Sequence, residues 1–441
     1  MNRMFFKLIV IISCICLTVA SCREDSDDIR SYVYEDSLNF AEAKSSLTGQ
    51  FKAIWTAMNC NYPIWDYEEQ QGLNWDDVYD EFLPRFMLLD KKYNKQNPVP
   101  DSLLRELYTD LLSPLHDGHL MLYLQNIHTG KSHADIYKYS VSPQLFRNLK
   151  TYEYIKPTLK YYNDSDKLKE YYAEKDDAEN EYIYACFKDN IVYFRLPVFN
   201  LTETLKNRSI NENSERIYSL WESWFNCIQN LYSSNSLKGV VIDLRNNPGG
   251  SADDYQYVLG ALHGGNNEYD NLSHTIGYIR EKNGIGRLDF SRLSTFALRI
   301  NKNHVPVKAP IVVLVNSFSA SMAEITCISA KQLKNGYVIG AKTYGAFSPL
   351  SDSYAMTYSG SVGDPTLADY KAENGEFFAP FYIYMPSCAF FSIEHQIIDG
   401  AGIEPDEIVH LDYLNYIDGR DNQIERALEY IREKGEVSDG N

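Results

Sequence analysis

The stretch KGVVIDLRNNPGG, at residues 238–250, decides the fold of this chain. Its apolar, β-branched run over 240–244 is typical of a strand that is buried on both faces of a parallel sheet. A Pro-Gly-Gly turn follows, and it lets the backbone bend sharply and expose its N–H groups. Because such a turn at the carboxyl end of a strand suits an oxyanion hole, Gly249 and Gly250 are candidate donors. For an isolated Pro-Gly-Gly, an ordinary strand-to-helix connection is the alternative.

A second segment, APIVVLVNSFSASMAEI at residues 309–325, has the same organisation. Its apolar run over 311–315 predicts a strand, a turn of small residues follows, and a helix is expected from Ser321. A serine between a strand and a helix N-terminus has an exposed hydroxyl beside main-chain N–H groups. Ser321 can therefore attack a carbonyl, with the N–H of Met322 as a further oxyanion donor. The alternative is that Ser319 or Ser321 only caps the helix.

Together these segments resemble the S41 peptidase family of C-terminal-processing and tricorn-type serine proteases. Further blocks resemble motifs of the same family, namely LLSPLHDGH at 111–119, GAKTYG at 340–345 and DGAGIEPD at 399–406. All the blocks follow the family's order across residues 45–412, and the ordered combination is more specific than any single block. The resemblance implies an α/β fold whose mixed sheet is covered by helices, with an N-terminal helical lobe. It also implies a serine peptidase that needs no cofactor and no metal.

The family's nucleophile is the first serine of an S-x-[SA]-E pattern, which implies Ser321 in the SMAE segment. Ser319 is the rival if the alignment slips. The bacterial subgroup takes a catalytic lysine from its G-x-x-T-[FY]-G-K-G turn. Here Ala346 stands in that place, and Lys342 matches a position that is not catalytic. The resemblance therefore implies that a Ser–Lys dyad is absent.

The tricorn-type subgroup uses a histidine and a carboxylate, which implies His119 as the base and Asp399 as its orienting acid. A neutral imidazole can accept the seryl proton near neutral pH, and a carboxylate on its other nitrogen fixes the tautomer. Asp399 is shorter than the family's glutamate, so Glu394 and Glu404 are fallback orienters. His116 and His119 also suggest a metal pair, but they lack the further ligands that a zinc site needs.

The sequence pattern at the N-terminus predicts a lipoprotein signal peptide. A positive start and an apolar stretch over 8–17 precede VASC at 19–22, which resembles a bacterial lipobox and implies a lipidated Cys22. A short transmembrane helix is the alternative, but a span needs about twenty apolar residues. An acidic tether follows Cys22. We expect attachment to the outer membrane of a cell envelope, with the periplasmic and surface-facing orientations both open.

Charge restricts the partners. The formal net charge is −18, which disfavours binding to nucleic acid and to anionic lipid head groups. We therefore expect membrane contact through the lipid anchor only. The expected substrate is a peptide or an unfolded protein, and the oligomeric state stays open.

Hydrophobic spacing gives the expected organisation. Helices are predicted within 47–115, at 213–232 and at 421–434, and strands at 191–196 and 337–340. The expected parts are a signal peptide (1–21), an acidic tether (22–45), a helical lobe that carries His119 (46–120), a variable insert (121–180), the S41-like core (181–412) and a C-terminal helix and tail (413–441). The insert is short for a PDZ domain and has no G-[LI]-G loop, so we expect none.

Two alternatives to an active peptidase remain at this point. The absent lysine and the aspartate at position 399 are compatible with a catalytically silent S41-like fold that binds peptides. A scaffold lipoprotein with a tyrosine-rich contact surface is the other alternative, since the chain has 35 tyrosines. The ordered motif blocks argue against the scaffold.

Overall fold

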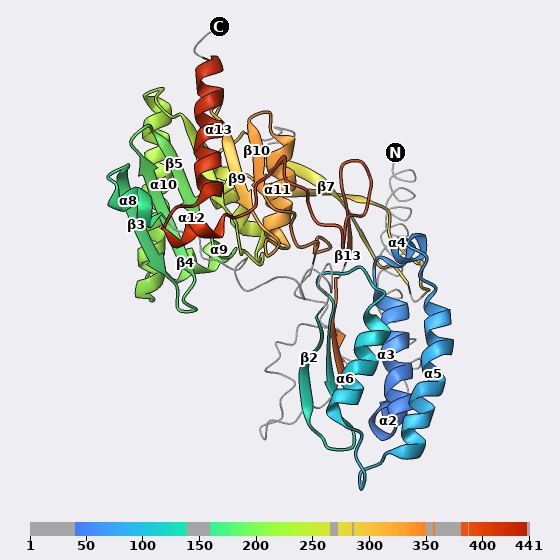
Figure 1. Cartoon of the computed structure of the whole chain (residues 1–441). Helices are drawn as coiled ribbons and strands as arrows, with labels where there is room; N and C mark the ends of the chain where they lie inside the picture. The colour runs from blue at the N-terminus through green and yellow to red at the C-terminus, as the bar shows by residue number, and fades with distance from the viewer. Residues whose placement is uncertain are drawn as a thin grey trace, which may run out of the picture.

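The chain folds into two lobes (Figure 1). The computed structural model describes residues 40–138, 159–264, 272–284, 286–349, 356–357, 381–386 and 388–438. The predicted signal peptide, Cys22 and most of the tether lie outside these residues. In the described part of the chain, no helix combines the length and apolar character needed to cross a membrane.

The N-terminal lobe is a set of helices packed on a small antiparallel sheet with the strand order β11-β12-β1-β2. Its helices bury apolar side chains at helical spacing, as α5 does with Trp75, Val78, Phe82 and Phe86. Its elements are α2 (Phe40–Ser45), α3 (Leu47–Asn61), α4 (Trp65–Gln70), α5 (Trp75–Lys92), α6 (Asp101–Leu112), β1 (Met121–Gln125), β2 (Ser132–Lys138), β11 (Met356–Thr357) and β12 (Phe381–Tyr384).

The second lobe is built on a seven-stranded sheet with the order β14-β10-β9-β6-β5-β4-β3. Strands β14 to β5 in this order are parallel, and β4 and β3 extend the sheet antiparallel. The strands are β3 (Leu168–Lys175), β4 (Glu181–Phe187), β5 (Ile191–Arg195), β6 (Gly239–Asp243), β9 (Ile311–Val315), β10 (Gly336–Gly340) and β14 (Glu407–Ile408). Every residue of β6 and β9 is buried, as expected for central strands covered on both faces.

Helices cover both faces of this sheet. One face packs against α9 (Leu201–Asn207), α10 (Glu212–Ser233), α11 (Met322–Gln332) and the short helices η1 (Ala252–Tyr257) and η2 (Leu259–Ala261). The other face packs against α8 (Lys160–Asp164) and the C-terminal α13 (Asn422–Ser438), which Figure 1 shows across the sheet. Helix α12 (Tyr413–Ile417) precedes α13.

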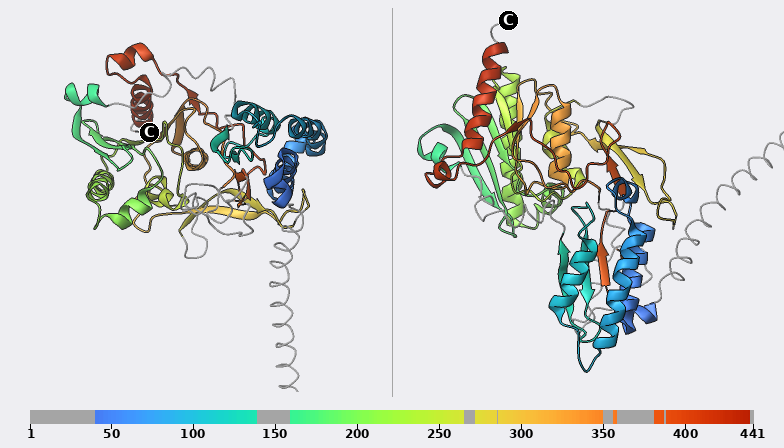
Figure 2. Two further views of the ribbon diagram at one scale, coloured as in Figure 1. Left: turned by 90° about the horizontal axis from the view of Figure 1, so that it is seen from below. Right: turned by 45° about the vertical axis from the view of Figure 1, so that its right-hand side comes forward.

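A three-stranded sheet, β13-β7-β8, joins the lobes. It consists of β7 (Ser273–Glu281), β8 (Ser294–Arg299) and β13 (Cys388–Phe391). Side chains alternate along β13, so Phe390 enters the core of the large-sheet lobe while Ala389 and Phe391 enter the core of the helical lobe. Both views in Figure 2 keep helices α3, α5 and α6 to one side of the large sheet.

The predicted elements match the structure closely. The expected strands at 240–244, 311–315, 191–196 and 337–340 correspond to β6, β9, β5 and β10, and the expected helices at 213–232 and 421–434 to α10 and α13. Strand β3 lies within the segment expected to be a variable insert, yet it is the edge strand of the large sheet. The absence of a PDZ domain stays a prediction, because part of that segment lies outside the described residues.

Candidate active site

The candidate site is formed by the loops that follow three neighbouring parallel strands, β6, β9 and β10, at their carboxyl ends. The turn with Gly249 and Gly250 follows β6, Ser321 follows β9, and the segment 341–348 follows β10. Parallel strands in register bring the loops after them to one edge of the sheet, which is where open α/β sheets form their sites.

Ser321 occupies a sharp elbow between β9 and α11. Its backbone has φ 53° and ψ −118°, a conformation that residues with a Cβ adopt only when the surroundings enforce it. Its carbonyl oxygen accepts the N–H groups of Glu324 (2.8 Å) and Ile325 (3.0 Å). The half-buried serine therefore opens the helix through its main chain.

The rival serine has a structural role. Ser319 is fully buried, its hydroxyl donates to the Leu244 carbonyl oxygen (2.8 Å), and it accepts the N–H of Asn316 (3.0 Å). These bonds join the ends of β6 and β9. The Ser319 hydroxyl is thus unavailable to a substrate.

The glycine turn after β6 touches the serine elbow directly. A Cβ built on Gly249 would come within 2.5 Å of the Ser321 Cβ and 2.9 Å of the Met322 nitrogen, so only glycine fits this contact. Gly249 has φ 100°, which also favours glycine. Its N–H donates to the Asn247 side-chain oxygen (2.8 Å) and is already used. Among the described residues, the N–H groups of Gly250 and Met322 donate no hydrogen bond.

Glu324 links the serine elbow to the segment after β10. Its fully buried carboxylate accepts the N–H groups of Ser321 (3.0 Å), Gly345 (2.6 Å) and Ala346 (2.8 Å), as well as the Thr343 hydroxyl. Burial raises the pKa of Glu324 to about 7, and these donors act against that rise. Sequence reasoning missed this role, although a glutamate three residues after a serine at a helix start is a capping-box signal.

His119 comes from the turn between α6 and β1, which packs on the same segment. A Cβ built on Gly118 would lie 2.6 Å from the Ala346 Cβ. The His119 N–H donates to Asp117 (2.7 Å), and its Nδ1 atom is buried without a hydrogen-bond partner among the described residues. Burial lowers the pKa of His119 to about 4, while the Ser348 main chain acts in the opposite direction. No hydrogen bond within the described residues joins His119 to Ser321 or to Asp399.

Asp399 lies next to this segment but uses its carboxylate elsewhere. It accepts the N–H groups of Phe347 (3.1 Å) and Ser348 (2.9 Å) and the Ser348 hydroxyl (2.6 Å). Burial raises the pKa of Asp399 to about 6. The structure thus brings His119, Ser321 and Asp399 to one segment, 343–348, without forming the hydrogen-bonded chain Asp399–His119–Ser321. The role of Asp399 as an orienter stays a prediction.

Neither fallback orienter forms a hydrogen bond with His119 among the described residues. Glu404 pairs with Lys342 (3.1 Å) and both are exposed, and Glu394 is exposed in the loop after β13. His116, the other histidine of the motif, bonds through its Nδ1 atom to the buried Glu68 (2.8 Å), and this contact raises the pKa of His116. It is therefore held by a carboxylate.

A buried acidic group lies behind the histidine turn. Asp117, Glu68 and Asp399 are all fully buried, and burial, together with the charge of Asp399, raises the pKa of Asp117 well above its usual range. Glu68 is satisfied by the Tyr62 hydroxyl (3.1 Å) and the His116 N–H (2.8 Å). In the described part of the chain, no cluster of three or more His, Cys, Asp or Glu residues is arranged to hold a metal ion.

Asp243 and Arg245, at the end of β6, form a charged pair with a structural role. Arg245 binds Asp243 through its Nη2 and Nε atoms (2.6 and 3.0 Å) and reaches Asp421 before α13 (2.9 Å). Burial alone would raise the pKa of Asp243, but Arg245 outweighs it and holds that pKa below its usual value. The network fixes α13 to the sheet.

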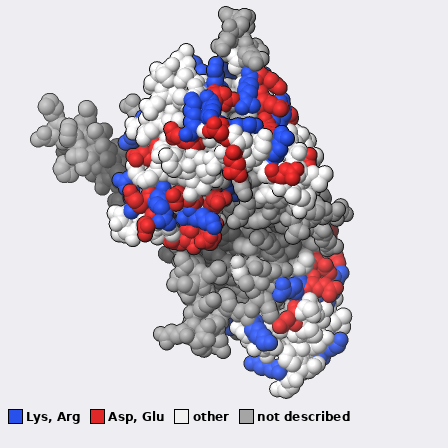
Figure 3. Space-filling view, turned by 60° about the vertical axis from the view of Figure 1, so that its left-hand side comes forward, with Lys and Arg blue, Asp and Glu red and all other residues white. Residues whose placement is uncertain are grey.

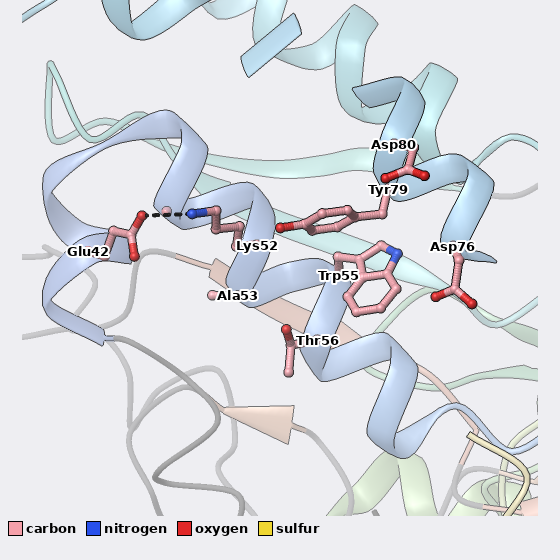
Figure 4. Close-up of a pocket in the computed structure, with 9 residues that line it drawn as sticks. Glu42, Lys52, Ala53, Trp55, Thr56, Asp76, Tyr79 and Asp80 are labelled. Carbon is pink, nitrogen blue, oxygen red and sulfur yellow. Dashed lines mark hydrogen bonds and ion pairs between the residues drawn. The ribbon is translucent and has the colours of Figure 1, made fainter. Parts of the chain in front are cut away.

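The cavity in Figure 4 is separate from this site. It has a volume of about 420 Å³ and lies between α3 and α5, with Trp55 and Tyr79 as an aromatic wall and Lys52 paired to Glu42 (3.3 Å). No residue of the candidate active site lines it.

Comparison with known proteins agrees with this site. The sequence model of peptidase family S41 matches residues 190–409, and by this match the chain belongs to that family over these residues. A solved structure of a candidate peptidase from Parabacteroides merdae is similar over 88% of this chain and 97% of that chain, with a TM-score of 0.57 and 19% identity. Mature CPAF complexed with lactacystin is similar over 90% of this chain and 98% of that chain, with a TM-score of 0.51 and 10% identity. No curated protein matches the sequence.

At these identities the solved structures show the fold alone. Family membership, together with this fold, supports a protease-like function.

Proposed function

We propose that this protein is a lipid-anchored serine endopeptidase whose nucleophile is Ser321. The observation that carries the proposal is the backbone of Ser321, held at φ 53° in a strand-to-helix elbow and pressed against Gly249. Strained conformations of this kind persist where the surroundings over-determine them, and they concentrate at catalytic residues. A structural helix cap needs no such strain.

The proposed chemistry uses groups that lie around this elbow. Ser321 Oγ attacks the peptide carbonyl carbon while His119 takes the hydroxyl proton, and His119 then gives that proton to the leaving amine. Water hydrolyses the resulting acyl-enzyme by the same route. The N–H groups of Gly250 and Met322 stabilise the oxyanion, each worth about 3 kcal/mol in comparable holes. Gly249, whose N–H is occupied, shapes the turn.

In this proposal Asp399 acts indirectly, through the segment that packs on the turn of His119. It fixes the main chain of Phe347 and Ser348, and that segment packs on the turn that carries His119. An orienting hydrogen bond to His119 would form when substrate reorders the segment. Catalytic hydrogen bonds are often long or absent without substrate and tighten in the complex.

The second candidate function is a catalytically silent peptide-binding protein. The unpartnered Nδ1 atom of His119 and the occupied carboxylate of Asp399 favour it. Hydrolysis by the wild-type protein would exclude it.

Anchoring belongs to the same proposal. A lipidated Cys22 would hold the enzyme at the envelope and present it to peptides or unfolded proteins. Growth with labelled palmitate should label the wild-type protein, and Cys22→Ala should prevent labelling and release the protein from membranes.

The direct test is casein hydrolysis by paired serine variants. Ser321→Ala should reduce hydrolysis to background, because removal of a triad nucleophile costs several orders of magnitude in rate. Ser319→Ala is the matched control; it leaves buried groups unpaired and should cost about 1–3 kcal/mol of stability while hydrolysis continues. Undiminished hydrolysis by a folded Ser321→Ala protein contradicts the assignment.

A further inference from the structure

A groove of about 910 Å³ runs between η1 and β8 in the large-sheet lobe. Its volume lies in the range of ligand-binding sites, about 300–1,000 Å³. Among the side chains that line it are Asp253, Gln256, Tyr257, Phe296, Arg299 and Lys302. None of these residues has a role in the chemistry proposed above.

The groove begins beside the proposed oxyanion turn. Ser251 follows Gly250 directly and caps η1 by accepting the Asp253 N–H, and Ala252 already lines the groove. Two residues of extended chain span at most about 7 Å, so the near end of the groove lies within that distance of Gly250. A polypeptide held at the elbow can therefore continue into the groove within a few residues.

The wall formed by β8 offers main-chain groups to such a polypeptide. In the described residues β8 is an edge strand, since the order is β13-β7-β8. The Ile300 N–H donates to the Leu272 carbonyl oxygen (3.0 Å), on the side of β7. The Asn301 N–H points to the opposite side and donates to the Gly260 carbonyl oxygen (3.0 Å). Main-chain groups alternate in direction along a strand, so the N–H of Arg299 points to the same side as the N–H of Asn301, away from β7. Extended peptides commonly bind by adding a strand to such an edge.

The charge of the groove contrasts with the rest of the chain. Arg299 and Lys302 are exposed and form no ion pair among the described residues, and Asp253 is the one carboxylate among the residues that line the groove. The chain as a whole has a net charge of −18. Unpaired cations in an acidic protein mark a place where a negative group gains attraction without displacing an internal partner.

Aromatic side chains supply the apolar part of the groove. Two contacts with Trp221 hold Tyr257 in place. The Tyr257 carbonyl oxygen accepts the indole N–H (2.8 Å), and the Tyr257 ring packs edge-on against the indole, with 5.4 Å between the ring centroids. Phe296 lies on β8 and is half-buried. Phe296 also packs edge-on against Phe390 of the core, so the aromatic surface offered to a ligand is chiefly the Tyr257 ring. Such a ring in the same lining as Arg299 and Lys302 suits a peptide that carries both apolar and acidic side chains.

We propose that this groove binds an extended segment of the polypeptide substrate and that Arg299 and Lys302 receive an acidic side chain of that segment. The inference rests on the proposed peptidase function, which it deepens by naming acidic polypeptides as the preferred substrate class.

Binding of fluorescent peptides to the full-length Ser321→Ala protein in detergent tests the proposal, since that variant cannot cleave them. A short amidated peptide with glutamates should bind about fivefold more tightly than its glutamine counterpart, the size expected for two exposed charge pairs. Added salt should remove the difference. Arg299→Gln with Lys302→Gln should abolish the preference. Arg105→Gln with Lys334→Gln, an equal loss of charge on exposed sites elsewhere, should leave it unchanged.

An unchanged preference in the groove variant overturns the proposal. An additional peptide with a free C-terminal carboxylate and no glutamate distinguishes a chain end from a side chain. If only that peptide responds to the groove substitutions, the occupant is a chain end and the proposal is wrong. Because binding needs no hydrolysis, a failure here leaves the labelling of Ser321 by a fluorophosphonate untouched. Absent labelling with an intact glutamate preference overturns only the catalytic assignment.

Discussion

At the scale of single residues, the backbone conformation of Ser321 distinguishes it from its neighbours. Its positive φ places its Cβ in a conformation that L-residues avoid, and Gly249 is pressed against that Cβ. A neighbouring serine, Ser319, has ordinary bonds to Leu244 and Asn316 and no exposure. The contrast separates the proposed nucleophile, Ser321, from the structural Ser319 within the same turn.

The strain at Ser321 predicts a stabilising substitution. Ser321→Gly removes the Cβ that φ 53° disfavours, so it should be about 1 kcal/mol more stable to urea unfolding than Ser321→Ala. Both variants lack the hydroxyl, so the difference isolates the backbone. Equal stability of the two variants would show that the conformation is not strained.

The buried environment of His119 predicts an unusual pH profile. A general base must be neutral in the free enzyme, and burial lowers the pKa of His119 to about 4. The acid limb of kcat/KM should therefore lie near pH 4 instead of near the ordinary histidine value, with circular dichroism confirming the fold at each pH. A limb centred near pH 6.5 would mean that the base is more solvated than this structure has it.

At the scale of elements, the segment after β10 is where the site is assembled. Glu324 ties it to the serine elbow and Asp399 fixes its far end. The carboxylate of Glu324 thereby couples the start of α11 to the position of the histidine turn, which packs on Ala346.

The raised pKa of Glu324 predicts a stability change with pH. The folded state holds this proton up to about pH 7, whereas the unfolded chain releases it near 4.5. The contribution is present below pH 4.5 and is lost as the pH rises through 7. The excess stability of wild type over Glu324→Gln should therefore fall by up to about 3 kcal/mol across that range.

Chemical unfolding at pH 4.5 and pH 8 measures this difference. Glu394→Gln, at an exposed position, is the control and should change stability by less than about 0.5 kcal/mol. A wild-type excess that is constant or grows with pH contradicts the assigned direction.

Elements were predictable where local pattern decides them. The strands at 240–244 and 311–315 are apolar runs between turn residues, and the structure confirms both. The bond of Glu324 to the Ser321 N–H follows from a capping-box spacing, but its bonds to Gly345 and Ala346 were not predictable. The roles of Asn247 and Ser348 were not predictable either, because they depend on which groups from distant segments meet these side chains. The engagement of Asp399 by Ser348 likewise follows from tertiary packing and not from any spacing in the sequence.

At the scale of the whole molecule, the proposed mechanism draws on both lobes, because His119 comes from the helical lobe and Ser321 from the lobe of the large sheet. The link runs through β13, which serves both cores, and through Arg280, which binds Asp66 at 2.7 and 2.8 Å. The face seen in Figure 3 has acidic and basic side chains interspersed over the large-sheet lobe. Surface ion pairs of this lobe include Arg432–Asp189 (2.7 Å).

The contact between Arg280 and Asp66 predicts coupling between the lobes. Asp66→Asn weakens a charge-assisted bidentate bond that is only partly exposed, so it should cost about 1–2 kcal/mol and increase proteolysis between the lobes. Asp77→Asn, exposed on α5, is the matched control. If the two variants are equally resistant to proteolysis, the lobes are held together by other contacts.

The most direct measurement of the central claim is covalent labelling of the folded protein by a fluorophosphonate probe, with the site mapped by mass spectrometry. We predict one labelled residue, Ser321, with labelling retained in Ser319→Ala and lost in Ser321→Ala. A folded wild-type protein that stays unlabelled, or one that is labelled at a different residue, would contradict the assignment of Ser321 as the nucleophile.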